Sequence, residues 1–333
     1  MKTEPAISVV IATRDRPACL ARLLACVKKQ ELEELECIVV DDASGEETLA
    51  AYNSIWRELD DRFRLLLPEQ RRAGGPSQAR NRGIKAAQGE FVAFCDDDDL
   101  WIRDDHLSVA VRAMRQHDGD LFFANLQTSR GGTVIGPDFY GAVRRPLTRN
   151  PVPGERDLFA VDRADRARSM KHMFLHCDSL VASRALLFDC GLYWEKLSMA
   201  EDRDLGLRLL DRATNVLYRS TVVADYDRTA TVGICKSYTE DEIRQFVVMA
   251  MMHAETQMGD RSLRAVARGY RAWMLVELAQ NASEAGRADQ ARELAYQSLL
   301  LRPTAAGLRL LLRSASRGLR ASTLRAENPA QTH

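Results

Sequence analysis

The stretch ARNRGIKAAQGEFVAFCDDDDLW, residues 79–101, contains most of a predicted helix, a predicted strand and an acidic run. Small and apolar residues recur over residues 77–87 at helical spacing, and Gly89 follows where such a helix would end. The apolar run at residues 91–95 predicts a short buried strand. Four aspartates come directly after it. We therefore expect their carboxylates at the carboxyl end of the sheet, where an open parallel sheet binds its ligands.

The same alternation of strands and helices fills the chain before this stretch. Apolar, β-branched runs predict strands, and apolar residues three and four positions apart predict the helices between them. The strands are expected at residues 7–12, 37–40, 63–67 and 91–95, and the helices at residues 20–27, 46–59 and 77–87. This order predicts an α/β fold with a mostly parallel sheet flanked by helices. Because the apolar runs are continuous, both faces of the sheet should be covered.

The pattern is interrupted after a predicted helix at residues 107–114 and a predicted strand at residues 121–126. Residues 131–165 are rich in Gly, Pro and Arg and show no periodicity, which predicts a long loop. Such a loop is either a functional lid or acceptor-facing segment, or a flexible insertion. Regular patterns return with a helix over residues 202–210 and strands at residues 179–182, 216–218 and 222–224.

The last third of the chain has helical patterns only. From residue 239 it is rich in Ala, Leu, Arg, Met and Glu, and residues 277–303 resemble one tetratricopeptide-type hairpin with Gly286 at its turn. A helical bundle packed on the first domain is the alternative, since repeat folds need several stacked copies. We expect a catalytic domain at residues 1–235, an all-α extension at 236–325 and a disordered tail at 326–333.

Composition excludes several classes of protein. Lys plus Arg and Asp plus Glu both total 47, so no net charge attracts nucleic acid, and none is expected as a partner. Seven cysteines occur without a Cys-x-x-Cys pair, which indicates free thiols in a reducing compartment. The amino terminus has no small-residue cleavage site, and no apolar run reaches the length of a membrane span. We therefore expect a cytoplasmic protein.

Three further polar clusters lie at or just after predicted strand ends or helix starts. Thr13, Arg14 and Asp15 follow the first strand, and Asp41 and Asp42 follow the second. Glu201 and Asp202 lie at the start of the helix predicted at residues 202–210. Each cluster alone could cap the helix that follows it. A carboxylate near the crevice could also accept a proton from an attacking hydroxyl, so the Glu-Asp pair is a candidate general base.

The acidic run itself predicts a cation site. Adjacent carboxylates repel one another unless a cation or a proton neutralises them, and a hard divalent cation with oxygen ligands does so. An EF-hand is excluded, because Trp101 stands where that loop needs Gly and Leu107 where it needs Glu. A solvated acidic loop is the alternative.

Four stretches in this order resemble the family 2 inverting glycosyltransferases of the GT-A fold. They are SVVIATRDRP (8–17), IVVDDAS (38–44), the stretch at 79–101 and AEDRDLGLRLL (200–210). The resemblance covers residues 7 to about 228. It implies that Thr13 and Asp42 face the nucleoside, with Asp42 reading the uracil edge of a uridine nucleotide. It also implies that Asp41 supports them and that Arg80 lies toward the nucleotide or its phosphates.

The resemblance also assigns the chemistry. Asp98, with Asp96, would bind Mn²⁺ or Mg²⁺, while Asp96 and Asp97 lie nearer the ribose. Asp202 would be the general base, with Glu201 beside it. The implied reaction is direct displacement at the anomeric carbon, with inversion. Its cofactors are a divalent cation and a nucleotide-sugar donor.

A hexosyltransferase-type enzyme (EC 2.4) of cell-surface polysaccharide or glycolipid synthesis is therefore expected, with a saccharide or lipid-linked acceptor. The alternative is a catalytically silent GT-A-like scaffold whose helical tail recruits partners.

The carboxy-terminal arginines add a further expectation, because a basic amphipathic helix can lie on the inner membrane surface. A solvated helix face is the alternative for this segment. The arginines are Arg309, Arg313, Arg317, Arg320 and Arg325.

Overall fold

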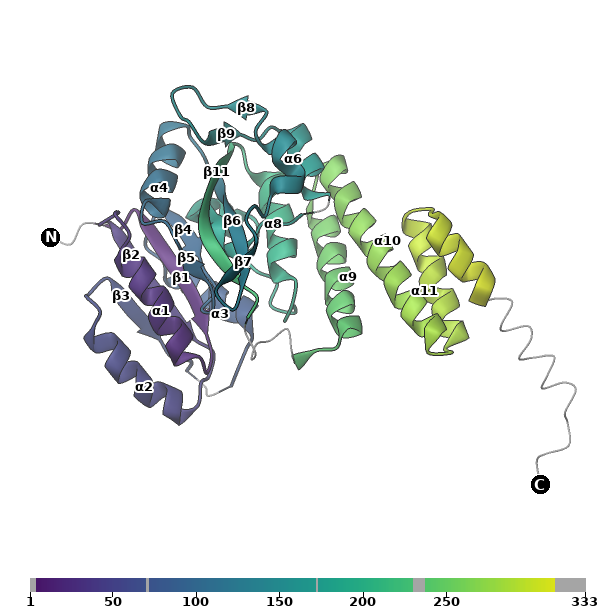
Figure 1. Ribbon diagram of the computed structural model, residues 1–333, viewed down its shortest axis with the longest axis horizontal. Helices are drawn as coiled ribbons and strands as arrows, with labels where there is room; N and C mark the ends of the chain where they lie inside the picture. The colour runs from purple at the N-terminus through teal and green to yellow at the C-terminus, as the bar shows by residue number, and fades with distance from the viewer. Residues whose placement is uncertain (1–3, 70–71, 172, 230–236, 315–333) are drawn as a thin grey trace, which may run out of the picture.

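The computed structural model describes residues 4–69, 72–171, 173–229 and 237–314, and is built on one eleven-stranded mixed sheet (Figure 1). The main path of the sheet has the order β3-β2-β1-β4-β10-β6-β11-β9-β8, with β5 paired to β11 and β7 to β6. The strands are β1 (Ile7–Thr13), β2 (Leu35–Asp41), β3 (Phe63–Leu66), β4 (Phe91–Phe94), β5 (Leu100–Trp101), β6 (Leu121–Arg130), β7 (Thr133–Gly136), β8 (Asn150–Pro151), β9 (Leu158–Ala160), β10 (Leu180–Ser183) and β11 (Val216–Asp227).

The amino-terminal half of the sheet is parallel. Strands β3, β2, β1 and β4 pair in parallel, and the side chains of β1, β2 and β4 are almost entirely buried. The helices of this half are α1 (Pro17–Lys28), α2 (Glu46–Arg57), α3 (Pro76–Ala86) and α4 (His106–Gln116). These elements confirm the repeated strand-helix pattern, including the buried strand that precedes the acidic run. The carboxyl ends of β1, β2 and β4 therefore lie at one edge.

Helix α3 lies unusually close to the sheet. A Cβ atom added at Gly83 would lie 2.4 Å from Val10 Cγ1 and 3.2 Å from Val40 Cγ2. Real Cβ atoms do not approach other heavy atoms that closely, so the position requires glycine for steric reasons. The helix carries Arg80 one turn before this contact.

Strand β10 changes the direction of the sheet. It is antiparallel to both of its neighbours, β4 and β6, whereas β6 and β11 are parallel to each other. The short helical turn η2 (Cys177–Ser179) leads directly into β10 and lies beside β4. Residues 176–178 are thereby brought next to the acidic run. The predicted fold class, α/β with helices flanking the sheet and a helical extension, is confirmed.

The predicted long loop at residues 131–165 is wrong. This segment contains β7, η1 (Gly141–Val143), α5 (Arg144–Leu147), β8, β9 and the start of α6 (Arg163–Met170). Its strands have two to four residues, which is too short for a period to be visible. Pairing of β7 with β6 and of β9 with β11, and burial of Tyr140 and Leu147, hold them in place.

The helical extension begins on the sheet domain and continues away from it (Figure 1). It contains α9 (Glu240–Gln257), α10 (Arg261–Glu284) and α11 (Ala288–Leu301), and residues 305–314 are also helical. Thr239 and Glu242 form a capping box at the start of α9. Gly286, with a φ of +75°, turns the chain between α10 and α11. Met251 of α9 and Tyr270 of α10 belong to the core of the sheet domain.

Helices α7 (Arg184–Asp189) and α8 (Glu201–Arg212) complete the sheet domain, and α9 packs on α8. His253 of α9 stacks on Trp194, with ring centroids 4.2 Å apart, and its Nδ1 lies 2.7 Å from Oδ1 of Asp204. The division at residue 235 stays a prediction, and the predicted tail at 326–333 lies outside the described residues, as do Arg317, Arg320 and Arg325 of the basic segment.

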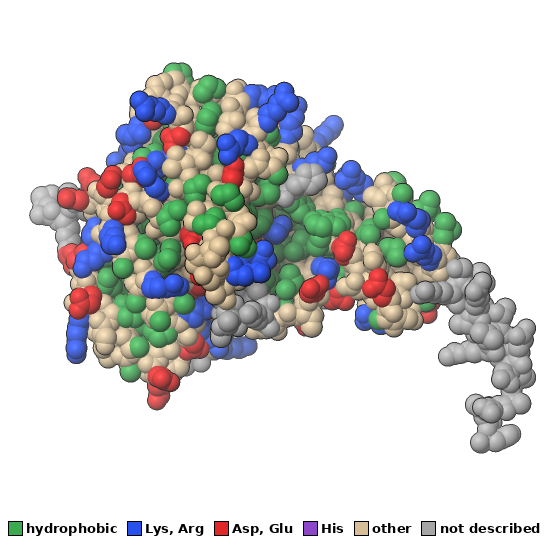
Figure 2. Space-filling view, viewed as in Figure 1, with side chains coloured by type: hydrophobic (Ala, Val, Ile, Leu, Met, Phe, Trp, Pro, Cys, Tyr) green, Lys and Arg blue, Asp and Glu red, His purple; other side chains and the backbone are tan. Residues whose placement is uncertain are grey.

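The surface mixes charges of both signs. Figure 2 shows both basic and acidic side chains on the face in view. Within the four described ranges, no helix is both long and apolar enough to cross a membrane.

Candidate active site

The end of β1 is tied to the acidic run. Thr13, the last residue of β1, donates from Oγ1 to Oδ2 of Asp97, at 2.7 Å. Both side chains are buried. Burial raises the pKa of Asp97 in spite of the opposing charge of Arg16 and the hydrogen bond from Thr13. The structure therefore brings together two of the residues that the sequence predicted to face the donor.

Arg16, which was not predicted as a site residue, pairs with the two aspartates in the middle of the acidic run. Its Nη1 lies 2.7 Å from Oδ1 of Asp97 and 2.9 Å from Oδ2 of Asp98, so one nitrogen bridges two neighbouring carboxylates. Burial, reinforced by the charge of Asp96, raises the pKa of Asp98 to about 7. The signal for Arg16 was its place before Pro17 at the start of the first helix, where a side chain can turn back to the strand end.

Asp41 and Asp42 have different surroundings at the end of β2. Asp41 accepts hydrogen bonds from the amide of Ser44 and the hydroxyl of Tyr52, at 2.9 and 2.8 Å. It therefore fixes the turn into α2. The carboxylate of Asp42 accepts from the amides of Gly74 and Gly75, at 2.7 and 3.0 Å, so that it closes the turn before α3.

Arg80 joins the acidic run to the start of α8. Its Nη2 donates to Oδ1 of Asp96 at 2.5 Å and its Nη1 to Oε1 of Glu201 at 2.7 Å. The guanidinium carbon lies 5.4 Å from the centre of the Tyr193 ring, and the Arg80 side chain is 6% exposed. The sequence placed Arg80 toward the nucleotide. In this structure it pairs with two carboxylates that lie 105 positions apart in the chain.

Glu201 and Asp202 form the first turn of α8. Ala200, which precedes them, has a φ of +61°, so the chain turns sharply into the helix. Burial raises the pKa of Glu201 and of Asp202. Arg80 partly offsets this effect at Glu201, and the amide of Arg203 donates to Oδ1 of Asp202 at 2.7 Å. A carboxylate with a raised pKa is a stronger proton acceptor than an ordinary aspartate.

Asp178, which was not predicted as a site residue, lies behind the run beside Asp99. Asp178 of η2 accepts from the amide of Asp96 at 2.9 Å, and Asp99 accepts from the amide of Asp227 at 2.7 Å. Burial, followed by the charge of the neighbouring Asp178, raises the pKa of Asp99. Burial disfavours a charged His176, but Asp178, 3.1 Å away, raises its pKa to about 9.

The donor set of the run fits a hard divalent cation. Asp96, Asp99 and Asp178 offer carboxylate oxygens that all lie within 4.8 Å of one another. The side chain of Asp98, two positions after Asp96, is 23% exposed. Oxygen ligands of this kind suit Mg²⁺ or Mn²⁺. Of the two predicted ligands, Asp96 lies in the group of three, whereas Asp98 is paired with Arg16.

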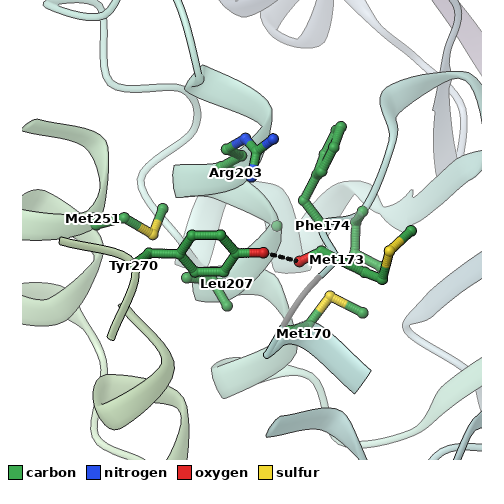
Figure 3. A pocket seen from close by; sticks show the side chains of 9 residues that line it. Met170, Met173, Phe174, Arg203, Leu207, Met251 and Tyr270 are labelled. Carbon is green, nitrogen blue, oxygen red and sulfur yellow. Dashed lines mark hydrogen bonds between the residues drawn. The ribbon is translucent and has the colours of Figure 1, made fainter. Parts of the chain in front are cut away.

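An apolar pocket lies between the sheet domain and the helical extension, next to α8 (Figure 3). Arg203, which follows Asp202, lies over the Phe174 ring, 4.1 Å from its centre, and the hydroxyl of Tyr270 donates to the backbone oxygen of Met173. The pocket is therefore closed on one side by α10. Its lining is Met170, Met173, Phe174, Leu175, Arg203, Gly206, Leu207, Met251 and Tyr270.

The strand order, the acidic run after β4 and the acidic start of α8 fit the GT-A fold. The profile described as "Glycosyl transferase family 2" matches residues 8–178, just over half of the chain. The chain belongs to this family, as its four sequence motifs indicated.

Two glycosyltransferases are similar to part of the chain. A Campylobacter jejuni GalNAc(5)-diNAcBac-PP-undecaprenol beta-1,3-glucosyltransferase is 36% identical over 95 residues, 28% of this chain and 30% of the relative. The Escherichia coli UDP-Glc:alpha-D-GlcNAc-diphosphoundecaprenol beta-1,3-glucosyltransferase WfgD is 27% identical over 130 residues, 39% of this chain and 49% of the relative. Both alignments cover less than half of the relative's own length.

Solved structures share the fold over almost the whole chain. Staphylococcus aureus TarS 1-349 in complex with UDP-GlcNAc has a TM-score of 0.67 at 17% identity, covering 96% of this chain and 92% of that one. The mannosyltransferase PcManGT from Pyrobaculum calidifontis, in complex with GDP-Man and Mn²⁺, has a TM-score of 0.59 at 17% identity, covering 99% and 89%. At this identity the likeness establishes the fold.

Proposed function

We propose that the protein is a metal-dependent inverting glycosyltransferase that moves a sugar from a nucleotide-diphosphate sugar to an acceptor hydroxyl. The observation that carries the proposal is the bridge from Asp96 through Arg80 to Glu201, which joins the acidic run to the acidic start of α8. A donor site and a base must be neighbours if one is to act on a substrate held by the other. Family membership supports the same reaction class.

Asp202 is the proposed general base. It would remove the proton from the acceptor hydroxyl as the oxygen attacks the anomeric carbon on the face opposite the leaving diphosphate. Its raised pKa favours proton acceptance, and Glu201 holds Arg80 beside it. One displacement of this kind inverts the anomeric configuration and needs no covalent enzyme intermediate.

Asp98 and Asp96 are the proposed cation ligands, with Asp99 and Asp178 close enough to join Asp96 in the donor set. A bound Mn²⁺ or Mg²⁺ would neutralise the charge that develops on the departing diphosphate. Thr13, Asp42 and Asp97 are the proposed nucleoside and ribose contacts. The hydrogen bonds that they make in this structure would hold their side chains in place before a donor arrives.

The donor and the acceptor follow the named relatives. We assign a uridine-diphosphate sugar, because WfgD is named for UDP-Glc and TarS was solved with UDP-GlcNAc. We assign a saccharide or lipid-linked acceptor in cell-surface polysaccharide or glycolipid synthesis, because two relatives are named for undecaprenol-linked substrates. A cytoplasmic location at the inner membrane surface suits such an acceptor. Leu308 and Leu312, exposed beside Arg309 and Arg313, support a membrane contact.

A thermal-shift panel of nucleotide sugars, with and without Mn²⁺, tests the donor site. UDP-sugars should stabilise the protein in Mn²⁺ and much less in EDTA, because the diphosphate and the cation bind together. Asp98→Asn should lose the Mn²⁺-dependent part of this stabilisation. Asp104→Asn, which removes an exposed carboxylate outside the site, is the matched control. If no nucleotide sugar stabilises the protein in either condition, the donor assignment fails.

Product analysis distinguishes an enzyme from a silent scaffold with the same fold. Incubation with a UDP-sugar and undecaprenyl-diphosphate-linked saccharides should release UDP and extend the acceptor in the wild type. The scaffold would be supported if the wild type binds a donor but transfers sugar to no acceptor tested, and if Asp202→Asn behaves in the same way.

A further inference from the structure

The acidic run carries a built-in positive charge at the place where the proposed cation would act. Arg16 Nη1 contacts one oxygen of Asp97 and one of Asp98, as a single cation between two carboxylates does. The Arg16 side chain is 21% exposed, so it is partly withdrawn from water. Two neighbouring, partly buried carboxylates need such a countercharge, because burial without one is costly.

The turn that carries Arg16 is fixed independently of the acidic run. Asp15 has a φ of +54°, and its Oδ1 accepts a hydrogen bond from the amide of Gly45 at 2.8 Å. The amide of Asp15 donates to Oγ of Ser44 at 2.9 Å. Arg16 then begins α1, its carbonyl accepting from the amide of Leu20 at 3.0 Å. The backbone position of Arg16 is therefore set by β2, α1 and the loop after β2, and only its side chain is free to move.

Asp97 and Asp98 differ in how firmly each is held by its neighbours. Asp97 is 6% exposed and also accepts the hydroxyl of Thr13, so it has two partners. Asp98 is 23% exposed and has Arg16 as its one ion-pair partner among the described residues. A divalent cation with carboxylate ligands carries twice the charge of a guanidinium and competes for the same oxygen. Asp98 is thus the carboxylate that Arg16 would release.

We propose that Arg16 exchanges with the divalent cation: it pairs with Asp97 and Asp98 in the cation-free protein and releases Asp98 when the cation binds. Arg16 is then a positioning residue, which keeps the two carboxylates oriented until the cation arrives. The inference rests on the proposed cation site and adds that Arg16 competes with the cation for Asp98. It implies that Arg16 weakens cation binding and stabilises the cation-free protein, because both effects come from the same ion pair.

The test compares Mn²⁺ binding and thermal unfolding of the full chain in wild type, Arg16→Gln and Arg14→Gln. Arg14 is the matched control, since it lies in the same turn, carries the same charge and pairs with the exposed Asp15. Arg16→Gln should bind Mn²⁺ about tenfold more tightly than Arg14→Gln by calorimetry. In EDTA, Arg16→Gln should melt about 3 °C or more below Arg14→Gln, and saturating Mn²⁺ should close most of that gap.

The outcomes separate this inference from the proposed function. If the wild type binds no Mn²⁺, the cation site itself is wrong. If the wild type binds Mn²⁺ and the two variants bind it equally, the exchange is wrong and the cation site stands.

A second measurement covers the case in which Arg16→Gln does not fold. In wild-type protein with ¹⁵N-labelled arginine, a Mg²⁺ titration should shift the guanidinium resonance of Arg16 and leave that of Arg14 in place. Arg16→Lys, which keeps the charge, assigns the resonance. An Arg16 signal that stays constant through saturation overturns the proposal.

Discussion

The hydroxyl of Thr13 donates a 2.7 Å hydrogen bond to Oδ2 of Asp97, and this bond joins the first strand of the sheet to the acidic run 84 positions later. Both groups are buried, so neither exchanges this partner for water. The orientation of Asp97 is thereby fixed by β1, and the position of its neighbours in the run follows from it. A single hydroxyl thus contributes to the shape of the whole acidic run.

Replacing this hydroxyl should cost stability without changing the size of the residue. We expect Thr13→Val to lower the free energy of unfolding by about 2 kcal/mol, since a hydrogen bond to a buried charged group is lost. Thr13→Ser keeps the hydroxyl and should lose less than half as much. Urea denaturation in EDTA measures both, and a loss in Thr13→Val no larger than that in Thr13→Ser would contradict the role given to the hydrogen bond.

Loss of the Arg80 bridge should lower the free energy of unfolding by more than loss of the Thr13 hydroxyl does. Arg80→Met leaves Asp96 and Glu201 without their countercharge, and removal of one partner from a buried ion pair costs about 3 kcal/mol or more. The exposed Arg115, paired with Glu90 on the surface, is the control, and Arg115→Met should cost less than about 1 kcal/mol. Urea unfolding curves measure the difference. Similar losses for the two variants would mean that the bridge is not a structural tie.

Substitutions of Glu201 and Asp202, at the start of α8, should affect donor binding and sugar transfer differently. Asp202→Asn should keep UDP-sugar binding and lower the transfer rate by about a hundredfold or more, because the proton acceptor is gone. Glu201→Gln should weaken the hold on Arg80 and keep more of the activity. In the wild type, kcat/KM should rise with pH through a pKa above that of an ordinary aspartate, since burial raises that of Asp202. Unchanged transfer by Asp202→Asn would reassign the base.

We expect His106 to make the stability of the fold depend on pH, separately from the aspartates of the acidic run. It is fully buried between Trp101 and Phe122, and neither ring nitrogen has a hydrogen-bond partner among the described residues. Burial, with the charge of Arg219, lowers its pKa to about 3. The unfolded chain binds a proton near pH 6.5 and the folded chain does not, so stability falls as pH drops below 6.5.

This contribution amounts to about 1.4 kcal/mol per pH unit between pH 6.5 and the folded pKa. His106→Leu, of similar size, should therefore flatten the decline of stability between pH 6.5 and 4.5. It should also stabilise the protein at pH 7 by about 1 kcal/mol, because a buried polar group without partners is removed. His117→Leu, at the end of the same helix, is the control. Parallel pH profiles for wild type and His106→Leu would contradict the assignment.

The sequence predicted the part of the fold that is regular and local. The buried runs of β1, β2 and β4 and the helices between them were visible as continuous apolar stretches, and the four motifs indicated the family. The short elements after β6 were not, since strands of two to four residues have no measurable period. Their order comes from pairing with β6 and β11, which a single sequence does not display.

The same distinction holds for the candidate site. Thr13, Asp97, Asp96 and Glu201 were predicted from their positions at strand ends and helix starts, and the structure places them in linked hydrogen bonds. Asp178 was missed, because it enters the site only when β10 inserts antiparallel between β4 and β6. Such an insertion joins residues that are 82 positions apart, and no local pattern records it.

The glycine of the ARNRG motif has a consequence beyond backbone freedom. With no Cβ at residue 83, α3 rests directly on Val10 and Val40, and the base of Arg80 is lowered toward the sheet by the thickness of one methyl group. Arg80 lies one turn before Gly83 in α3, and its two terminal nitrogens contact Asp96 and Glu201. Residue 83 therefore matters through an atom that it lacks, because the missing Cβ lets the helix that carries Arg80 pack directly on Val10 and Val40.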